Sequence, residues 1–356
     1  MNTKIKQILE LAVANGASDV HLSVSTLPKL RVNGELVDVT NFDISQPEAV
    51  SEMILSILTD EQKQIFSKEK ELDLSVNIEE ARFRVNIYLQ RGEVRCALRV
   101  VPTNIPTFND LNLPDIFSEI VDYKQGFVLV TGPTGHGKST TVASALNRIN
   151  AEHKSHIVTI EDPIEYILKP IKSVISQREL GNDTLGFGVA LKSVLRQDPN
   201  VVFVGEMRDL ETISSALTIA ETGHLVFSTL HTNSAAQTID RIVDVFPEGS
   251  KEQIRVQLAS VITAVISQRL IPSIAGGRVP AFEIMMATSA VKNSIREGKS
   301  FMIDNIIQTS SDLGMVGLET SLSRLVHQGI ITEEVAMSYS LRPSELQSSL
   351  RSYKKL

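Results

Sequence analysis

The first hundred residues alternate between apolar and polar positions with the spacing of a small α+β domain. Apolar residues three and four apart mark helices, and apolar residues two apart mark strands. Asn33-Gly34 stands between two alternating runs and is typical of a tight hairpin turn. The pattern predicts an amphipathic helix at about residues 1–13, strands at 20–24, 30–32 and 36–39, a helical stretch at 47–68 and a further strand at 72–78.

A second predicted hairpin carries paired cationic side chains. Residues 83–89 and 94–100 alternate as strands on either side of a turn at Arg91-Gly92. This register places Arg84 opposite Arg99, and two arginines that face each other repel. Either water screens this polar face, or the arginines meet an anion, such as a phosphate on a neighbouring subunit.

A different pattern begins after residues 102–116, which are rich in proline and asparagine and read as a linker. Short, continuous apolar runs then alternate with helical stretches, which is typical of a parallel sheet buried on both faces. The strands are predicted at Phe127–Thr131, Ile157–Ile160, Val201–Val204 and Leu225–Leu230. We therefore expect an α/β fold with an N-terminal α+β domain, a linker, an α/β core and a helical C-terminal region, over residues 1–101, 102–116, 117–286 and 287–356.

One segment fits the phosphate-binding pattern G-x-x-x-x-G-K-[ST], and it lies between a predicted strand and a predicted helix, as that motif requires. Glycines let backbone N–H groups close around phosphate oxygens, and the helix N-terminus favours the anion. Lys138 can reach the β- and γ-phosphates of ATP, and Ser139 can bind Mg²⁺. The predicted nucleotide-binding residues of this P-loop are Gly132, Pro133, Thr134, Gly135, His136, Gly137, Lys138, Ser139 and Thr140.

Three further strand ends carry candidate catalytic groups. Glu161, with Glu165 as the alternative, can orient or deprotonate the attacking water. The third strand ends in Gly205 where a typical Walker B strand has Asp, so Glu206 is the predicted Mg²⁺ ligand, acting through water. His231 follows a strand expected beside the P-loop strand, where it either senses the γ-phosphate or has a structural role.

Composition narrows the class of protein further. The 356 residues have a formal net charge of −7, which argues against a general nucleic-acid role. Cys96 is the only cysteine, which excludes a disulfide framework and a cysteine zinc site. No apolar run approaches the roughly 20 residues that span a bilayer. The N-terminus carries Lys4, Lys6 and Glu10 within its apolar pattern and does not resemble a signal peptide.

The order of these motifs resembles the secretion ATPase superfamily and, within it, the type IV pilus retraction ATPases. The resemblance covers nearly all of the chain. Besides the P-loop, it is carried by the segments 159–165 (TIEDPIE), 205–209 (GEMRD) and 222–232 (TGHLVFSTLHT). In the rest of the chain it is carried by 18–22 (SDVHL), 31–34 (RVNG), 82–86 (RFRVN), 98–102 (LRVVP) and 238–247 (TIDRIVDVFP).

The resemblance implies a PAS-like N-terminal domain, a RecA-like ATPase domain and a homohexameric ring with ATP between the domains. Arg82, Arg84 and Arg99 match the arginines that complete the site in this family. Glu161 falls in the family's Asp box and Glu206 in its Walker B motif, and His224 and His231 fall in its His box. The implied work is ATP-driven domain rotation at the cytoplasmic face of the inner membrane. That rotation would turn a membrane platform protein, with a second pilus motor ATPase as a further partner.

One segment departs from the retraction family. Its motif Ala-Ile-Arg-Asn-Leu-Ile-Arg-Glu reads here as Ala290–Glu297 with five identical positions, and the changes include Lys292 for Arg and Ser294 for Leu. Three alternatives stay open. A pilus assembly or type II secretion ATPase would carry an extra N-terminal domain and a four-cysteine metal site, a RecA-like DNA translocase would need a basic pore, and a regulatory subunit would bind ATP with little hydrolysis.

Overall fold

The computed structural model describes residues 2–24, 26–32, 34–40, 47–78, 81–102 and 104–353, and the chain forms two compact units. Unit 1 comprises Met1–Asn104 with Pro163–Ile167, and unit 2 comprises Ile105–Asp162 with Leu168–Leu356. Each unit has its own buried core. Within the described ranges, no helix combines the length and the apolar character needed to cross a membrane.

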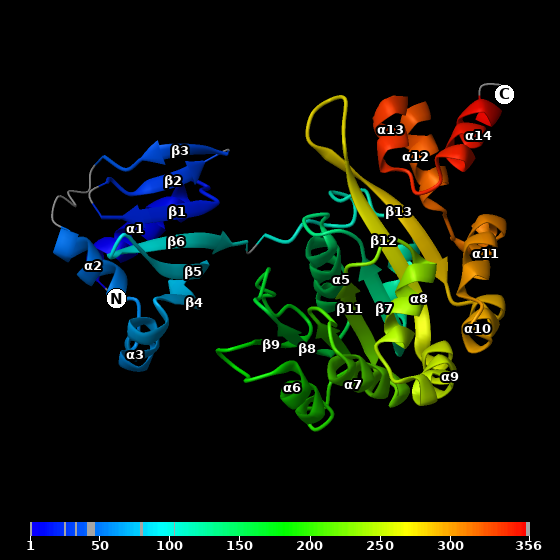
Figure 1. Cartoon of the computed structure of the whole chain (residues 1–356), viewed down its shortest axis with the longest axis horizontal. Helices are drawn as coiled ribbons and strands as arrows, with labels where there is room; N and C mark the ends of the chain where they lie inside the picture. Colours follow the sequence, from blue (N-terminus) through cyan, green and yellow to red (C-terminus); the bar gives the residue numbers. More distant parts are fainter. Residues whose placement is uncertain are drawn as a thin grey trace. The chain divides into compact units, whose positions relative to one another are not determined.

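Unit 1 is an antiparallel sheet in the order β3-β2-β1-β6-β5-β4, packed against three helices (Figure 1). Alternation along the strands supplies the core, since Val20 and Leu22 face inward with Phe83 and Val85. The elements of unit 1 are α1 (Thr3–Ala14), β1 (Asp19–Ser23), β2 (Lys29–Val32), β3 (Glu35–Asp38), α2 (Pro47–Leu55), α3 (Asp60–Glu69), β4 (Glu71–Ile78), β5 (Ala81–Gln90) and β6 (Glu93–Val101).

The helical stretch predicted over residues 47–68 forms as two helices, α2 and α3. A capping box starts α3: the Thr59 hydroxyl accepts the Gln62 N–H at 3.2 Å, and the Gln62 side chain accepts the Thr59 N–H at 3.0 Å. Thr-x-x-Gln was therefore a helix-start signal within the predicted helix. The predicted turn residue Asn33 lies outside the described residues, while β2 and β3 on either side of it pair as a hairpin.

The β5–β6 hairpin has the predicted register, and Arg84 pairs directly with Arg99. Arg91 and Gly92 form the turn, and both have positive φ, at 55° and 84°. Two such residues in succession give the twist that suits a two-residue hairpin loop. Asp19 on β1 also faces Arg99, and its carboxylate lies 2.9 Å from the Arg99 Nε. This ion pair offsets part of the repulsion between the two arginines.

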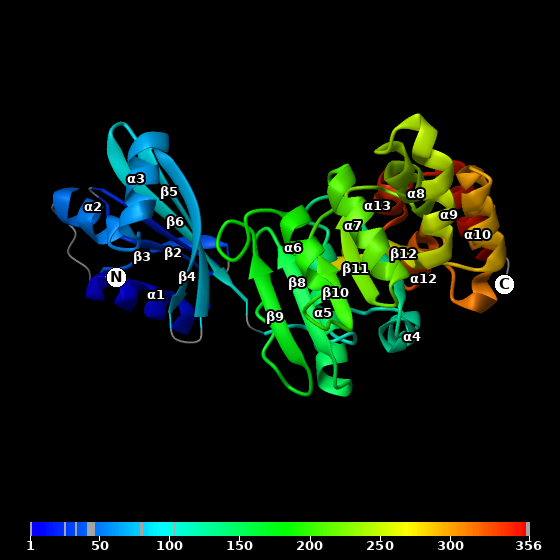
Figure 2. The same cartoon turned by 90° about the horizontal axis from the view of Figure 1, so that it is seen from below.

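Unit 2 is a doubly wound sheet in the order β13-β12-β7-β11-β10-β8-β9, parallel throughout except between β12 and β13. Helix α5 covers one face of this sheet, and α6 and α7 cover the other (Figure 2), as the usual right-handed crossovers require. The elements of its N-terminal half are α4 (Ile116–Asp122), β7 (Gly126–Thr131), α5 (Lys138–Glu152), β8 (His156–Glu161), β9 (Val174–Glu179), α6 (Phe187–Val194), β10 (Val201–Val204), α7 (Leu210–Glu221) and β11 (Leu225–Leu230). This architecture confirms the predicted α/β fold class.

The second half of unit 2 contains a long hairpin that the sequence analysis missed. In Figure 1, β12 and β13 extend from the sheet toward α12 and α13, and Ile271 and Ala281 join the apolar cluster of those helices. The hairpin therefore connects the sheet to the C-terminal helices. The elements of this half are α8 (Ala235–Asp244), α9 (Lys251–Val261), β12 (Ile262–Pro272), β13 (Arg278–Met286), α10 (Ser289–Arg296), α11 (Ile303–Thr309), α12 (Leu318–His327), α13 (Glu333–Tyr339) and α14 (Pro343–Tyr353).

Candidate active site

The P-loop joins β7 to α5 at the carboxyl end of the parallel strands. Every residue of β7 is buried, so the loop leaves a rigid strand. Gly132 has a φ of 140°, and a Cβ at this position would lie 2.2 Å from the Gln268 carbonyl oxygen of β12. Only glycine permits both this conformation and this close approach. The first N–H groups of α5 then face the loop, where they suit an anion.

Lys138, the first residue of α5, lies across the mouth of the loop. Its Nζ donates to the carbonyl oxygens of Gly132 and Pro133 at 2.8 and 2.9 Å. The side chain is only 7% exposed. Burial lowers the pKa of Lys138, and the negative charge of Glu206 opposes that shift. A positive charge is thus fixed where the motif is expected to meet the terminal phosphates of a nucleotide.

Glu206 and His231 meet beside this lysine, because β10 and β11 are adjacent parallel strands. The Glu206 Oε1 lies 3.2 Å from His231 Nε2, and its Oε2 accepts a 2.8 Å hydrogen bond from Arg208. The Arg208 hydrogen bond, opposed by burial, lowers the pKa of Glu206, so the carboxylate stays ionised. The His231 Nδ1 lies 3.2 Å from the Thr134 hydroxyl and 3.5 Å from the Lys138 Nζ.

A proton on His231 Nε2 satisfies these contacts, since the ring then donates to Glu206 and accepts through Nδ1. One imidazole thus connects the Walker B carboxylate to the P-loop. A cavity of about 540 Å³, lined by Glu206 and His231 together with Arg208, Gln237 and Asp240, opens beside this pair.

Glu161 ends β8 with its side chain buried, at 6% residue exposure. Its Oε1 accepts hydrogen bonds from the Thr159 hydroxyl at 2.7 Å and from Gln177 at 3.2 Å. These two donors fix the carboxylate in one orientation. A Cβ on Gly205 would lie 3.2 Å from the Glu161 Cα, which gives a physical reason for glycine where Walker B strands usually carry Asp.

Some of the predicted site residues lie with the P-loop in unit 2, and others lie at the opposite end of the sheet or in unit 1. Glu161, Glu206 and His231 lie with the P-loop at one edge of the unit 2 sheet. His224 does not, because it precedes β11 and its ring contacts Thr222 and the Ile219 carbonyl. Six residues of extended strand separate it from His231, about 20 Å at the usual rise. His224 is therefore at the wrong end of the sheet to contact the nucleotide of this chain.

The other predicted residues belong to unit 1. Arg82 and Arg84 lie on β5 and Arg99 lies on β6, with Arg84 and Arg99 exposed. Glu165 is exposed too, in the segment Pro163–Ile167 that groups with unit 1. Of the two acidic candidates, Glu161 is thus the one that belongs to unit 2 and lies at the carboxyl end of its parallel strands, as the P-loop does.

The sequence analysis missed the residues of β12 and β13 that hold the P-loop. The Gln268 side chain donates to the His136 carbonyl at 2.9 Å and accepts from the Thr141 hydroxyl at 2.7 Å. The Leu270 N–H donates to His136 Nδ1 at 2.9 Å, and Arg278 donates to the Gly135 carbonyl at 3.1 Å.

His136, which had no role of its own in the sequence analysis, is therefore a fixed part of the loop. The only sequence signal was a polar pair, Gln268-Arg269, within an apolar strand.

Two of the predicted residues fit a magnesium ion. Mg²⁺ prefers oxygen ligands and keeps several waters, so a hydroxyl and one ionised carboxylate are a sufficient protein contribution. Ser139 stands at the start of α5, and Glu206 keeps its charge beside Lys138. These residues can hold the ion on the phosphate side of the loop.

Comparisons with known proteins identify relatives of the whole chain. The family model of type II/IV secretion system proteins matches residues 1–277. The type IV pilus retraction ATPase PilT of Pseudomonas aeruginosa is 46% identical over 333 residues, 93% of this chain and 96% of the relative. A twitching motility protein of Neisseria gonorrhoeae is 48% identical over 311 residues, 87% of this chain and 83% of the relative. The crystal structure of the pilus retraction motor PilT with bound ADP superposes with a TM-score of 0.89 at 45% identity, covering 98% of this chain and all of that one.

The contact between Gly132 and Gln268 can be tested by substitution. We expect Gly132→Ala to lower the Tm of the nucleotide-free protein by several degrees, because the methyl group would meet a backbone carbonyl. Gly135→Ala is the matched control, since Gly135 also has a positive φ, 76°, but its Cβ position is open. Thermal unfolding followed by circular dichroism measures both variants. Equal losses in the two would show that backbone conformation alone, and not β12, constrains Gly132.

Proposed function

This chain belongs to the type II/IV secretion system protein family and is an ATPase, and we propose that it is the motor that powers retraction of a type IV pilus. The observation that carries the proposal is a similarity to retraction ATPases that runs through both units and accompanies a full set of ATPase groups. A regulatory subunit that binds ATP without hydrolysing it would not need Glu161 and Glu206 to be fixed as they are.

In the proposed reaction, water attacks the γ-phosphorus of ATP, the bond from this phosphorus to the β–γ bridging oxygen breaks, and the water loses a proton. Lys138 and the P-loop N–H groups bind the phosphates, and His231 transfers its Nε2–H hydrogen bond from Glu206 to the γ-phosphate when ATP is bound. Glu161 orients the water and accepts its proton, because Thr159 and Gln177 hold its carboxylate in place. Ser139 and Glu206 would hold Mg²⁺, which supplies charge neutralisation for the phosphates when it is bound.

Arginines of unit 1 are proposed to complete the site. Arg84 and Arg99 present exposed guanidinium groups on one face of the β5–β6 hairpin, next to Arg82. Guanidinium groups suit the charge that develops on a transferred phosphoryl group. In a hexameric ring these arginines would come from a neighbouring subunit, so hydrolysis in one subunit would depend on the position of the next.

The proposed partners of this chain follow from its proposed role in pilus retraction. The ring would act at the cytoplasmic face of the inner membrane on a pilus platform protein, and a second pilus motor ATPase would share the task. A pilus assembly or type II secretion ATPase is the second candidate, since the family model is described only as that of type II/IV secretion system proteins and does not separate the two.

Replacement of the Walker B glutamate separates binding from hydrolysis. We expect Glu206→Gln to lower kcat by about 100-fold or more while ADP binding persists, because the P-loop contacts remain and the carboxylate that would hold Mg²⁺ is lost. Phosphate release and the binding of a fluorescent ADP analogue measure the two effects. Lys138→Ala should lose binding as well.

Asp240→Asn is the control for the glutamate variant, because Asp240 is an exposed carboxylate in the same cavity and should leave kcat near the native value. Native turnover in Glu206→Gln would remove Glu206 from the mechanism.

Mixed rings test whether the arginines act between subunits. Arg84→Ala alone should cut kcat without changing the Tm, because Arg84 is exposed. When Arg84→Ala and Glu206→Gln chains are mixed, some sites combine an intact Glu206 with an intact Arg84 from another chain. Phosphate release should then exceed that of either variant. A mixture no more active than its components would mean that the arginine serves its own chain or none.

The cellular role is tested in a bacterium that lacks this gene. We expect loss of twitching motility with an excess of surface pili, restored by the native gene and not by Lys138→Ala. Loss of the pili themselves would instead favour the assembly ATPase. Unchanged motility and pilus number would contradict both roles.

A further inference from the structure

The short segment between His231 and α8 has two polar anchors outside the nucleotide site. The Asn233 Oδ1 accepts a 3.2 Å hydrogen bond from Arg269 Nη2. The Ala235 N–H, in the first turn of α8, donates to Glu283 Oε1 at 2.7 Å. Asn233 and Ala235 are two and four residues from His231, too few to let the histidine move far while both anchors hold.

Arg269 extends the first anchor to the C-terminal helices. It lies on β12 next to Gln268, which holds the P-loop. Its Nη1 donates to the carbonyl of Tyr339, the last residue of α13, at 3.3 Å. One guanidinium group therefore bridges the His231 segment and α13.

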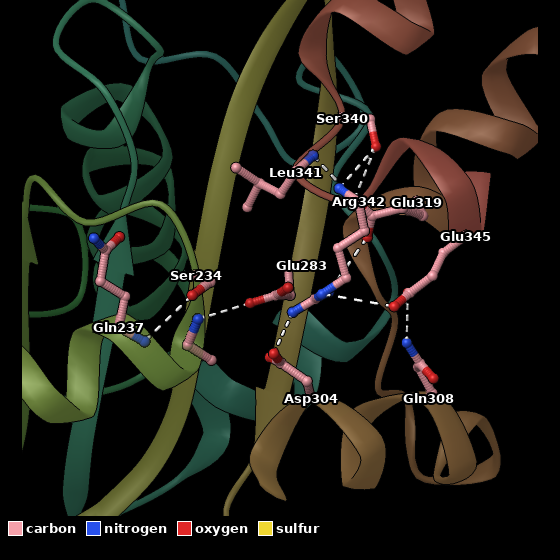
Figure 3. A network of polar contacts seen from close by, with 11 residues as sticks. Ser234, Gln237, Glu283, Asp304, Gln308, Glu319, Ser340, Leu341, Arg342 and Glu345 are labelled. Carbon is pink, nitrogen blue, oxygen red and sulfur yellow. Dashed lines mark hydrogen bonds and ion pairs between the residues drawn. The ribbon is translucent and has the colours of Figure 1, made fainter. Parts of the chain in front are cut away.

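Glu283 extends the second anchor into a polar network (Figure 3). It lies on β13 and is only 1% exposed. The charged groups that face it are Asp304 of α11, Glu319 of α12, and Arg342, which lies between α13 and α14. Arg342 pairs with Asp304 and Glu319, and Glu319 also accepts the backbone N–H groups of Leu341 and Arg342 at 3.1 and 2.9 Å.

Burial and these charged neighbours together mean that Glu283 gains or loses its proton near neutral pH. Burial raises its pKa to about 7; the Ala235 hydrogen bond and Arg342 favour the charged form, and Asp304 and Glu319 oppose it. Arg269 on the neighbouring strand also interacts with this carboxylate. The ionised form binds the Ala235 N–H more strongly than the neutral form does.

We propose that Arg269 and Glu283 are positioning residues that fix His231 against Glu206 and Lys138 and link its position to the C-terminal helices. This inference rests on the proposed function, in which His231 acts at the γ-phosphate. Both anchors and the P-loop contacts of Gln268 and Leu270 come from one hairpin. A shift of the C-terminal helices against that hairpin would thus move His231 and the P-loop in concert.

Asn233 offers the cleanest test of the first anchor, because it is exposed and its replacement should not unfold the chain. We expect Asn233→Ala to lower kcat about fivefold, the effect of one lost hydrogen bond, with the KM for ATP unchanged. Asn233→Asp keeps an acceptor for Arg269 and should restore native kcat. A native kcat in Asn233→Ala, or equal losses in both variants, would overturn the role of Arg269.

The second anchor is tested by the pH profile of Glu283→Gln, in which the side chain stays neutral. Relative to the native protein, its kcat should be similar at pH 6 and fall severalfold by pH 8, with the change centred near pH 7. A purely structural role would lower activity by the same factor at every pH. A constant ratio from pH 6 to 8 would overturn the role of Glu283.

Two controls separate this inference from the proposed function. Gln308→Ala removes a hydrogen bond to Glu345 at the edge of the same network, 2.8 Å long, without touching the His231 segment, and it should keep native kcat. His231→Ala should lose most activity. If it does, and Asn233→Ala and Glu283→Gln stay native, only the positioning inference fails. If His231→Ala itself turns over ATP normally, the assigned role of His231 fails together with the inference.

Discussion

The close packing of β12 against the P-loop is the constraint on which the rest of unit 2 depends. Gly132 leaves no room for a side chain between β7 and the Gln268 carbonyl, so the loop starts with its backbone directly against β12. The Gln268 side chain then bonds the loop at His136 and the following helix at Thr141. A buried amide with both ends satisfied has few alternative positions. Hydrogen bonds from the Gln268 side chain thus hold the P-loop and the start of α5 against β12.

Charge in the site is balanced within a small group of residues. Lys138 and Arg208 are cationic, and Glu206 lies between them with His231 as its second partner. Burying Lys138 and much of Glu206 costs free energy, and the attraction between opposite charges offsets that cost only when hydrogen-bond partners are in place, whereas Arg208 stays largely exposed. The short contacts among them show that the partners are in place. An incoming polyphosphate therefore meets an organised field that needs little rearrangement.

Patterns within short segments of the sequence predicted the features that neighbouring residues determine, namely strand register and the phosphate-binding loop. Strand alternation fixed the register of β5 and β6 down to the Arg84–Arg99 pair, and the P-loop motif fixed the position of Lys138. The direction of β11 explains why His224 lies away from the site. His224 precedes β11 and His231 follows it, so the two histidines lie at opposite ends of the strand. The β12–β13 hairpin could not be recognised because α9 ends at Val261 and β12 begins at Ile262, with no turn residue to mark a boundary. Its contacts with the P-loop join residues about 130 positions apart, a separation that no periodicity reports.

The departures from the retraction motif lie on a different part of unit 2. Ser294 is buried on α10, where its hydroxyl donates to the Ala290 carbonyl at 3.0 Å, so the polar group is satisfied within the helix. Lys292 lines a cavity with Gln125 and Ser260, and Gln125 directly precedes β7 at the end of that strand opposite the P-loop. The contacts of Ser294 and the cavity that Lys292 lines involve neither the P-loop nor Glu206 and His231. The length of β7 therefore separates the cavity that Lys292 lines from the P-loop, whose geometry β12 imposes.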